Sequence, residues 1–115
     1  MAAKGYWIAR LDVTDADAYK KYVEANAEAF GKYGAKFLTR GGPYLSLEGV
    51  PRDRNVVLEF ATVGTALACY QSPEYQRAFK IREHAAVSDI VIMAGYDGPQ
   101  PPEQPGAKAQ VKAAI

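Results

Sequence analysis

The sequence predicts an α+β fold, a four-stranded antiparallel sheet with two helices on one face. Segments with strand-like and helix-like patterns alternate in the order strand, helix, strand, strand, helix, strand over residues 6–96. Three of the four strands are also apolar on both faces, which is typical of strands covered on both sides. In this βαββαβ order two split βαβ units interlock, so the first and third strands are predicted to lie in the middle of the sheet.

The first strand is predicted over residues 6–13, where alternating side chains point to opposite faces. Thr14 is a typical N-cap residue, and the acidic residues that follow it favour a helix start. Aromatic and apolar residues then recur at helical spacing as far as Tyr33, and Gly34 ends the helix. Asn26 interrupts this apolar stripe, so a polar side chain is predicted to point inward.

The second strand is predicted over residues 35–40 and is expected to resume at residues 44–48, after a bulge or kink at Gly41-Gly42-Pro43. Because proline cannot donate to a central ladder, we expect this strand at the edge of the sheet. The third strand, residues 55–61, is apolar at almost every position and carries one carboxylate, Glu59. Its pattern predicts a central strand.

A second helical region begins at Val63 and is divided at Ser72-Pro73, a helix-start signal that predicts a new segment at an angle. Residues 89–96 are predicted as the fourth strand. Residues 1–97 thus form one domain. Residues 98–115 are Pro-rich, and we expect them to form a flexible C-terminal tail.

Composition narrows the classes of function. Hydrophobic residues make up 49% and charged residues 23%, as in ordinary globular proteins. Fourteen Lys and Arg against thirteen Asp and Glu leave a formal charge of +1 without a basic patch, so no nucleic-acid partner is expected. One Cys and one His cannot build a structural zinc site, and no metal or cofactor is expected. A single Cys, with no signal-like or membrane-spanning run, favours a cytoplasmic protein with no membrane partner.

The helices of this arrangement cover only one face of the sheet, although the strands are apolar on both. The second face therefore needs burial by something outside the chain, most simply the sheet of a second copy. We expect a homodimer.

Several segments resemble a bacterial family of uncharacterised proteins in the dimeric α+β barrel superfamily, which is related to the ferredoxin-like fold. The resemblance spans about Lys4 to Tyr96 and rests on these motifs in order: Lys4-Gly5-Tyr6-Trp7-Ile8-Ala9-Arg10, Asp15 to Tyr19, Phe37-Leu38-Thr39-Arg40-Gly41-Gly42, Leu58-Glu59-Phe60, Ser72-Pro73-Glu74-Tyr75-Gln76 and Arg82. The chain departs from the family pattern at Cys69 and in its tail. The resemblance implies a dimer whose two sheets close into a barrel, with sites in a cavity between the sheet and the helices of each subunit. Relatives in the superfamily include cofactor-free monooxygenases, isomerases, cyclases, stress-responsive proteins and haem-binding proteins, so the fold does not select a function.

Three charged or titratable residues are candidates for chemistry. Arg40 can hold a carboxylate ligand through its planar fork of donors, or pair with Glu59 on the neighbouring strand. Glu59 can act as a general base with a pKa raised by burial, or serve as the structural partner of Arg40 or Arg82. His84 titrates near neutrality and can carry a proton, although a histidine late in a helix also simply complements the dipole.

Other candidates would bind a ligand without reacting. Asn26 and Arg82 lie on inward stripes by spacing and are predicted to line a pocket. Tyr70 and Tyr75, together with Tyr19 and Tyr22, can stack on an aromatic ligand or simply fill the core. Cys69 is expected to be inert packing.

Three functions follow from these candidates. The first is a homodimer that binds a small molecule in a pocket formed by Asn26, Arg40, Glu59, Tyr75 and Arg82. The second is a cofactor-independent enzyme of the monooxygenase, isomerase or cyclase type that uses the same pocket, with Glu59 or His84 as the base. The third is a structural or stress-related interaction module that needs no pocket.

Overall fold

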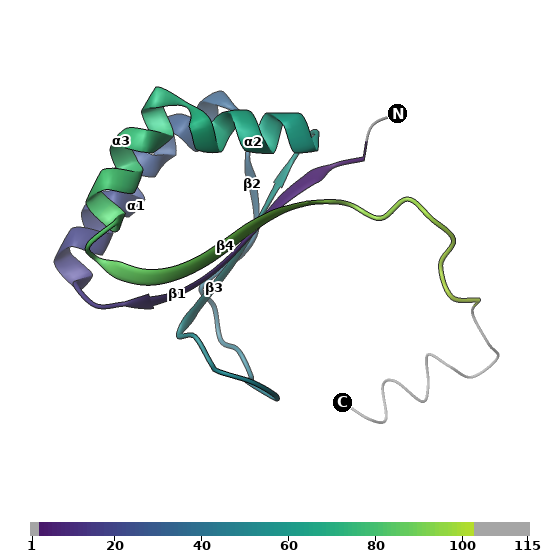
Figure 1. The fold of residues 1–115 in the computed structure, drawn as a ribbon, viewed down its shortest axis with the longest axis horizontal. Helices are drawn as coiled ribbons and strands as arrows, with labels where there is room; N and C mark the ends of the chain where they lie inside the picture. Colours follow the sequence, from purple (N-terminus) through teal and green to yellow (C-terminus); the bar gives the residue numbers. More distant parts are fainter. Residues whose placement is uncertain (1–2, 103–115) are drawn as a thin grey trace.

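The computed structural model describes residues 3–102 and has the predicted α+β architecture. Its elements in chain order are β1 (Gly5–Val13), α1 (Ala16–Lys32), β2 (Lys36–Arg40), β3 (Arg54–Phe60), α2 (Val63–Gln71), α3 (Pro73–Arg82) and β4 (Ala86–Ala94). All neighbouring strands are antiparallel and run in the order β2-β3-β1-β4, which confirms β1 and β3 as the central pair. Figure 1 shows the helices together on one side of the curved sheet, while the other side stays open.

The two faces of the sheet differ as the alternation of residues requires. Along β1 and β3 every second side chain, including Trp7, Leu11 and Leu58, is buried under the helices. The residues between them point to the face without helices, which we call the open face. There Ile8 of β1 lies opposite both Val57 of β3 and Val91 of β4.

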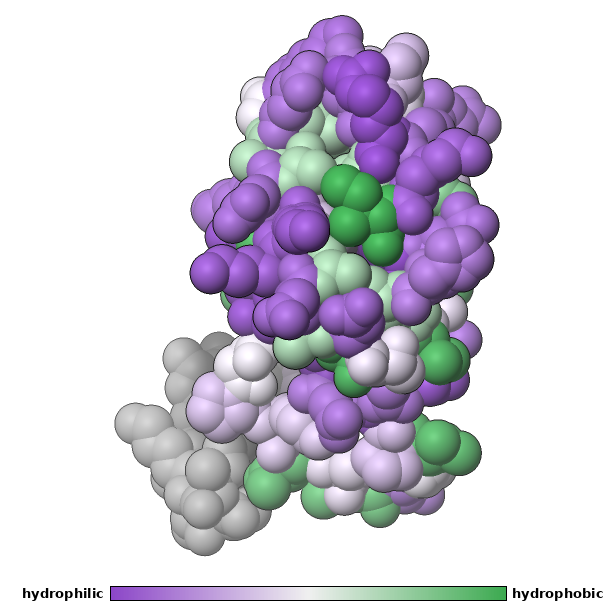
Figure 2. Space-filling view, turned by 90° about the vertical axis from the view of Figure 1, so that its left-hand side faces the viewer, coloured by the Kyte–Doolittle hydropathy of each residue, from purple (hydrophilic) through white to green (hydrophobic). Residues whose placement is uncertain are grey.

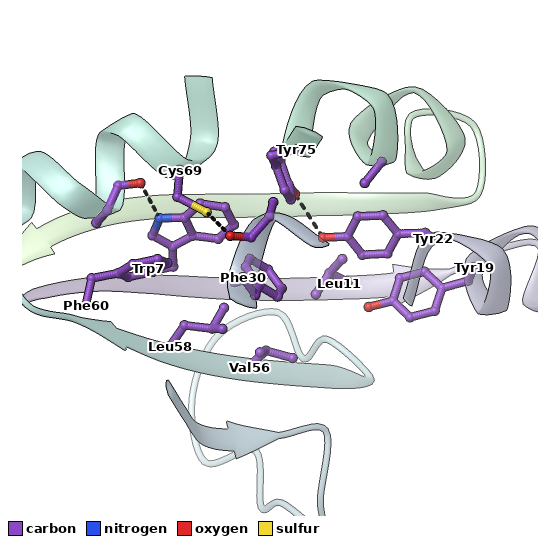
Figure 3. Packing of buried hydrophobic residues seen from close by; sticks show 14 of the residues in the cluster. Trp7, Leu11, Tyr19, Tyr22, Phe30, Val56, Leu58, Phe60, Cys69 and Tyr75 are labelled. Carbon is purple, nitrogen blue, oxygen red and sulfur yellow. Dashed lines mark hydrogen bonds between the residues drawn. The ribbon is translucent and has the colours of Figure 1, made fainter. Parts of the chain in front are cut away.

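The core under the helices is largely aromatic (Figure 3). The Trp7 ring meets Phe30 and Tyr75 edge-on, with centroids 5.3 and 4.9 Å away. Its indole Nε1 donates to the Ala66 carbonyl at 2.9 Å, which satisfies the one polar atom of a ring that is 1% exposed. This contact also fixes α2 over the centre of the sheet.

The helix ends follow local capping chemistry, with one correction. The N-cap of α1 is Asp15, whose carboxylate accepts from the Ala18 N–H at 3.1 Å, and not Thr14. The backbone N–H of Thr14 is instead bonded to the Ala85 carbonyl, which keeps the chain extended for one more residue. Gly34 ends the helix as predicted, with φ of +67°.

The break between α2 and α3 lies at Ser72, as predicted. Its hydroxyl accepts from the Tyr75 N–H at 3.1 Å and donates to the Cys69 carbonyl at 2.7 Å. One buried side chain therefore closes one helix and starts the next.

The sequence prediction was wrong for the segment between β2 and β3, residues 41–53, because it placed a strand at residues 44–48. We call this segment the arm. It contains no strand and extends below the sheet in Figure 1. Gly41, with φ of +69°, turns the chain out of the sheet directly after β2. Arg52 then ties the end of the arm to the open face through Asp12, at 2.7 Å, and Asp89, at 3.1 Å.

The C-terminal part also differs in detail. The fourth strand begins at Ala86 and not at Asp89, because it pairs with the whole length of β1 up to Val13. Residues 98–102 form neither helix nor strand, and the rest of the predicted tail, residues 103–115, lies outside the described residues. Among residues 3–102 no helix is long and apolar enough to cross a membrane.

Candidate functional site

A cavity lies between the sheet and α1, on the side of the sheet where β2 forms the edge. It holds about 30 Å³, enough for about two water molecules. The lining residues are Trp7, Ala9, Leu11, Tyr19, Tyr22, Val23, Asn26, Phe30, Phe37, Arg40, Arg54, Val56, Leu58 and Ile90. The walls are therefore mostly apolar, with a small set of polar groups, as is usual in ligand pockets.

The inward stripe of α1 supplies one wall. Tyr19, Tyr22 and Asn26 follow one another at helical spacing, and all three are buried. Asn26 is 5% exposed as a residue, and no hydrogen bond joins its side-chain amide to another residue of the described chain. The amide atoms are not among the fully enclosed polar atoms without a partner, so they are open to the cavity that Asn26 lines and can bind water or a ligand there.

A bulge in β2 brings Arg40 to the same cavity. The register with β3 shifts between Phe37 and Thr39, so Leu38 is the extra residue. Phe37 and Arg40 then share one face of the strand, and the Arg40 guanidinium lies 4.0 Å from the centre of the Phe37 ring. The Thr39 hydroxyl takes the place of a backbone acceptor in the disturbed ladder, because it accepts from the Val57 N–H at 2.9 Å.

Arg54 lies at the start of β3 beside Arg40. Its Nε donates to the Tyr19 hydroxyl at 3.0 Å, and its guanidinium lies 5.4 Å from the centre of the Tyr19 ring. Sequence reasoning missed Arg54, although a signal was present. The residue has the same parity along β3 as Val56 and Leu58, and so it faces the helices.

Behind the cavity wall lies a chain of hydroxyl groups that ends at a buried cation. The Tyr22 and Tyr75 hydroxyl oxygens are 2.8 Å apart, and Arg82 Nη2 donates to the Tyr75 oxygen over a long 3.5 Å (Figure 3 shows the tyrosine pair). Arg82 is only 4% exposed, and its Nε has no partner among residues 3–102. Burial raises the pKa of Tyr75, so this phenol stays protonated. Tyr75 and Arg82 thus reach the cavity only through Tyr22.

Two other predicted residues lie in the core outside the cavity lining. Tyr70 is half-buried and packs against Trp7 and Tyr75, with ring centroids 5.6 and 5.3 Å away. Cys69 is fully buried, and burial raises the pKa of its thiol to about 12, which agrees with the expectation of inert packing.

The expected position of Glu59 in the pocket is corrected by the structure. Glu59 alternates with the inward Leu58 and Phe60, so its carboxylate lies on the open face. There Oε1 is 3.1 Å from Lys4 Nζ and Oε2 accepts from the Tyr6 hydroxyl at 3.0 Å. The bonds from Lys4 and then Tyr6 lower the pKa of Glu59, whereas the sequence suggested a raised one. The alternative pairing of Glu59 with Arg40 or Arg82 is also not formed.

His84 lies in the turn after α3 and not inside the helix, since α3 ends at Arg82. Its side chain is 86% exposed and has one nearby carboxylate, that of Glu83 at 3.6 Å. Neither Glu59 nor His84 therefore lines the cavity.

A second hollow, of about 240 Å³, lies between the arm and the open face. It is lined by Arg10, Asn55 and residues of the arm, and Arg10 Nη2 donates to the Val50 carbonyl at 2.8 Å. In residues 3–102 we find no cluster of three or more His, Cys, Asp or Glu side chains that could hold a metal ion.

The fold and its one-sided helix layer define an α+β protein of the ferredoxin-like class. Residues 4–96 match the family described as a domain of unknown function, DUF1330, and the chain belongs to this family. The resemblance to an uncharacterised family is thereby confirmed.

Solved structures with the same fold include proteins of unknown function and one enzyme. A protein of unknown function from Rhodopseudomonas palustris is 19% identical with a TM-score of 0.70, over 85% of this chain and 86% of that chain. A dimeric ferredoxin-like protein of unknown function from Thermobifida fusca YX is 19% identical with a TM-score of 0.56, over 82% and 92%.

SnoaB, a cofactor-independent oxygenase from Streptomyces nogalater, is 11% identical with a TM-score of 0.56, over 84% of this chain and 97% of that chain. At these identities the likeness shows the fold alone. A comparison with curated proteins finds no significant match.

Proposed function

We propose that the protein is a homodimer that binds a small organic molecule in the cavity between the sheet and α1 of each subunit. The observation that carries the proposal is the Asn26 amide, which interrupts the apolar face of α1, forms no hydrogen bond with the described side chains and opens onto the cavity. A polar group at this position needs water or a ligand as its partner. A guest in the cavity would satisfy it here, because Asn26 is one of the lining residues.

The open face supports the dimer. Besides Ile8 and Val57 it carries Val91 and Met93, which are 56% and 49% exposed. Exposed apolar groups on adjacent strands form a continuous patch, and a second sheet packed against it would bury that patch. The dimeric ferredoxin-like relative from Thermobifida fusca agrees with this assembly.

The arm adds to the apolar surface that a partner would cover. Leu45, Leu47 and Val50 are 88%, 86% and 73% exposed. Figure 2 shows that the side of the molecule turned to the viewer is mostly hydrophilic, with a hydrophobic patch near its centre and further hydrophobic residues at its lower end, the level of the arm in Figure 1. The arm thus exposes apolar side chains outside the helix layer.

Native mass spectrometry of the purified protein tests assembly and ligand together. We expect a dimer, with extra mass that disappears on denaturation if the guest is retained. The matched variants are Val91→Asp on the open face and Leu67→Asp on α2, whose side chain is 44% exposed in the helix layer. We expect Val91→Asp to give monomers and Leu67→Asp to remain dimeric. A monomeric wild type, or loss of the dimer in both variants alike, would contradict the proposed assembly.

Asn26→Leu tests the cavity. It fills the site with an apolar side chain of similar size, so any retained guest should be lost while the dimer persists. Asn26→Gln keeps the amide and serves as the control. A guest that is retained equally by both variants would place the binding site elsewhere.

A further inference from the structure

The distribution of unpaired arginines points to the chemistry of the guest. The arginines of the described chain fall into two groups. Arg52 pairs with Asp12 and Asp89, and Arg77 pairs with Glu28. Arg40, Arg54 and Arg82 have no carboxylate partner within residues 3–102, and all three lie at the cavity or directly behind it. Arg10, the remaining arginine, also has no carboxylate partner there, but its guanidinium binds the Val50 carbonyl.

The cavity lining contains cations but no anion. Arg40 and Arg54 line it, and no Asp or Glu is among the lining residues. Arg54 uses only Nε for the Tyr19 hydroxyl, which leaves its two terminal nitrogens without a side-chain partner in the described part of the chain. Because a guanidinium can only donate, such a site favours a ligand that accepts hydrogen bonds and carries negative charge.

The tyrosine pair supplies a further donor. Arg82 occupies one lone pair of the Tyr75 oxygen, so the Tyr75 proton is left for the Tyr22 oxygen at 2.8 Å. With its oxygen accepting from Tyr75, the Tyr22 hydroxyl keeps its own proton for a group in the cavity. The reverse orientation would leave the buried Tyr75 proton without an acceptor, which is the costlier arrangement. The buried Arg82 charge thus polarises a hydroxyl group that lines the cavity.

We propose that the cavity binds a small organic carboxylate, with the carboxylate at Arg54 and Arg40 and the hydrocarbon part against the apolar wall. This inference rests on the proposed function and names the ligand class of the same site. A bidentate arginine contact fits the two carboxylate oxygens. The ring of Phe37 and the side chains of Leu11 and Val56 offer the apolar surface.

The size of the site limits the guest. The cavity of about 30 Å³ is too small to enclose an aromatic ring as it stands. The carboxylate is therefore expected near the mouth, where Arg40 is exposed, and the body of the ligand enters as the Arg54 side chain moves off Tyr19.

Benzoate and benzamide provide a matched pair of probes, because they share size and shape and differ in charge. Titration of each into the dimer, followed through the Trp7 indole resonance and the Asn26 side-chain resonances, gives two dissociation constants. We expect benzoate to bind at least tenfold more tightly than benzamide, and we expect that preference to fall with increasing salt.

Variants identify the source of the preference. Arg54→Met and Arg40→Met should each reduce benzoate affinity several-fold and leave benzamide affinity nearly unchanged. Arg77→Met removes a surface arginine that pairs with Glu28 on the outside of the helices, and it should change neither constant. Because Arg40 is exposed, Arg40→Met is expected to fold normally, so the test can still be made if Arg54→Met folds poorly.

The possible results separate this inference from the proposed function. Equal binding of benzoate and benzamide at Trp7 and Asn26 would overturn the carboxylate assignment and leave the binding cavity standing. A preference for benzoate that survives both arginine substitutions would also overturn the carboxylate assignment, since groups other than these arginines would then bind the charge. If neither probe shifts these resonances, the carboxylate assignment fails together with the proposed cavity for guests of one ring.

Discussion

The hydroxyl oxygens of Tyr22 and Tyr75 lie 2.8 Å apart, although the residues are 53 positions apart in the chain. One comes from α1 and the other from α3, so this contact joins the two long helices above the sheet. Tyr75 is fully buried and also accepts from Arg82. A single phenol oxygen therefore connects the helix layer to the only buried arginine of the described chain.

Tyr75→Phe is expected to lower the free energy of unfolding by about 1–3 kcal/mol, because it leaves Arg82 and Tyr22 without their shared buried partner. Urea denaturation followed by circular dichroism measures the loss. Tyr96→Phe is the matched control, since Tyr96 is 68% exposed and binds only the Pro99 carbonyl. The control should stay within about 0.5 kcal/mol of the wild type. Equal effects of the two substitutions would mean that the buried contact contributes nothing.

Substitution by alanine is expected to have opposite effects on stability at Gly5 and at Gly31. A Cβ at Gly5 would lie 2.5 Å from the Thr62 carbonyl oxygen, where β1 passes under the start of α2. Gly5→Ala must shift backbone and is expected to cost about 1–3 kcal/mol.

A Cβ at Gly31 meets nothing within 4 Å, and the residue lies inside α1. Gly31→Ala should therefore stabilise the protein by up to about 1 kcal/mol. Thermal unfolding of the two variants beside the wild type provides the comparison, and a stabilised Gly5→Ala would show that the close approach does not exist in solution.

Much of the fold can be predicted because local and periodic signals agree. Gly34 has the left-handed φ that ends α1, and Ser72 with Pro73 separates α2 from α3. The arm could not be predicted in the same way. Residues 44–48 have a strand-like composition, but a strand needs a neighbour with free backbone groups, and Gly41 turns the chain away before it can pair.

The candidate site was predicted in part. The helical spacing placed Asn26 correctly, because a stripe on a helix depends only on sequence distance. Glu59 was assigned to the wrong face, although its alternation with Leu58 already contained the answer. Arg40 is different, since its direction depends on the bulge at Leu38, and nothing in the sequence marks that residue as the extra one. Tertiary pairing decides such details.

The Asp12 carboxyl is expected to make the folded protein less stable in acid. The bond from the Asp53 N–H, and then the Arg52 guanidinium, lower the pKa of the Asp12 carboxyl in the folded state. A depressed folded pKa gives stability that is fully present above the unfolded value of about 3.9 and is lost as the pH falls through the folded value. We therefore expect the free energy of unfolding to fall below about pH 4, as the end of the arm is released.

Asp12→Asn should be less stable than the wild type at pH 7 and should lose less on acidification. Urea denaturation at pH 7 and pH 3 measures both the stability at pH 7 and its loss on acidification. Glu24→Gln is the control, because Glu24 is exposed on α1 and forms no ion pair among the described residues. If Asp12→Asn loses as much stability on acidification as the wild type, the acid sensitivity arises from other carboxylates.

Cys69 is expected to resist thiol reagents in the folded protein. It is 0% exposed, its Sγ lies 3.8 Å from the Ala29 carbonyl oxygen, and burial raises the pKa of the thiol to about 12. At pH 8 only about one thiol in ten thousand would then be ionised, and the reactive species is the thiolate. Labelling with a disulfide reagent should be rapid and complete in 6 M guanidinium, a concentration chosen to exceed the usual unfolding range of about 5 M. Without denaturant it should be slower by several orders of magnitude. Rapid labelling of the folded protein would instead show that α2 opens locally, because Cys69 is fully buried while α2 is in place.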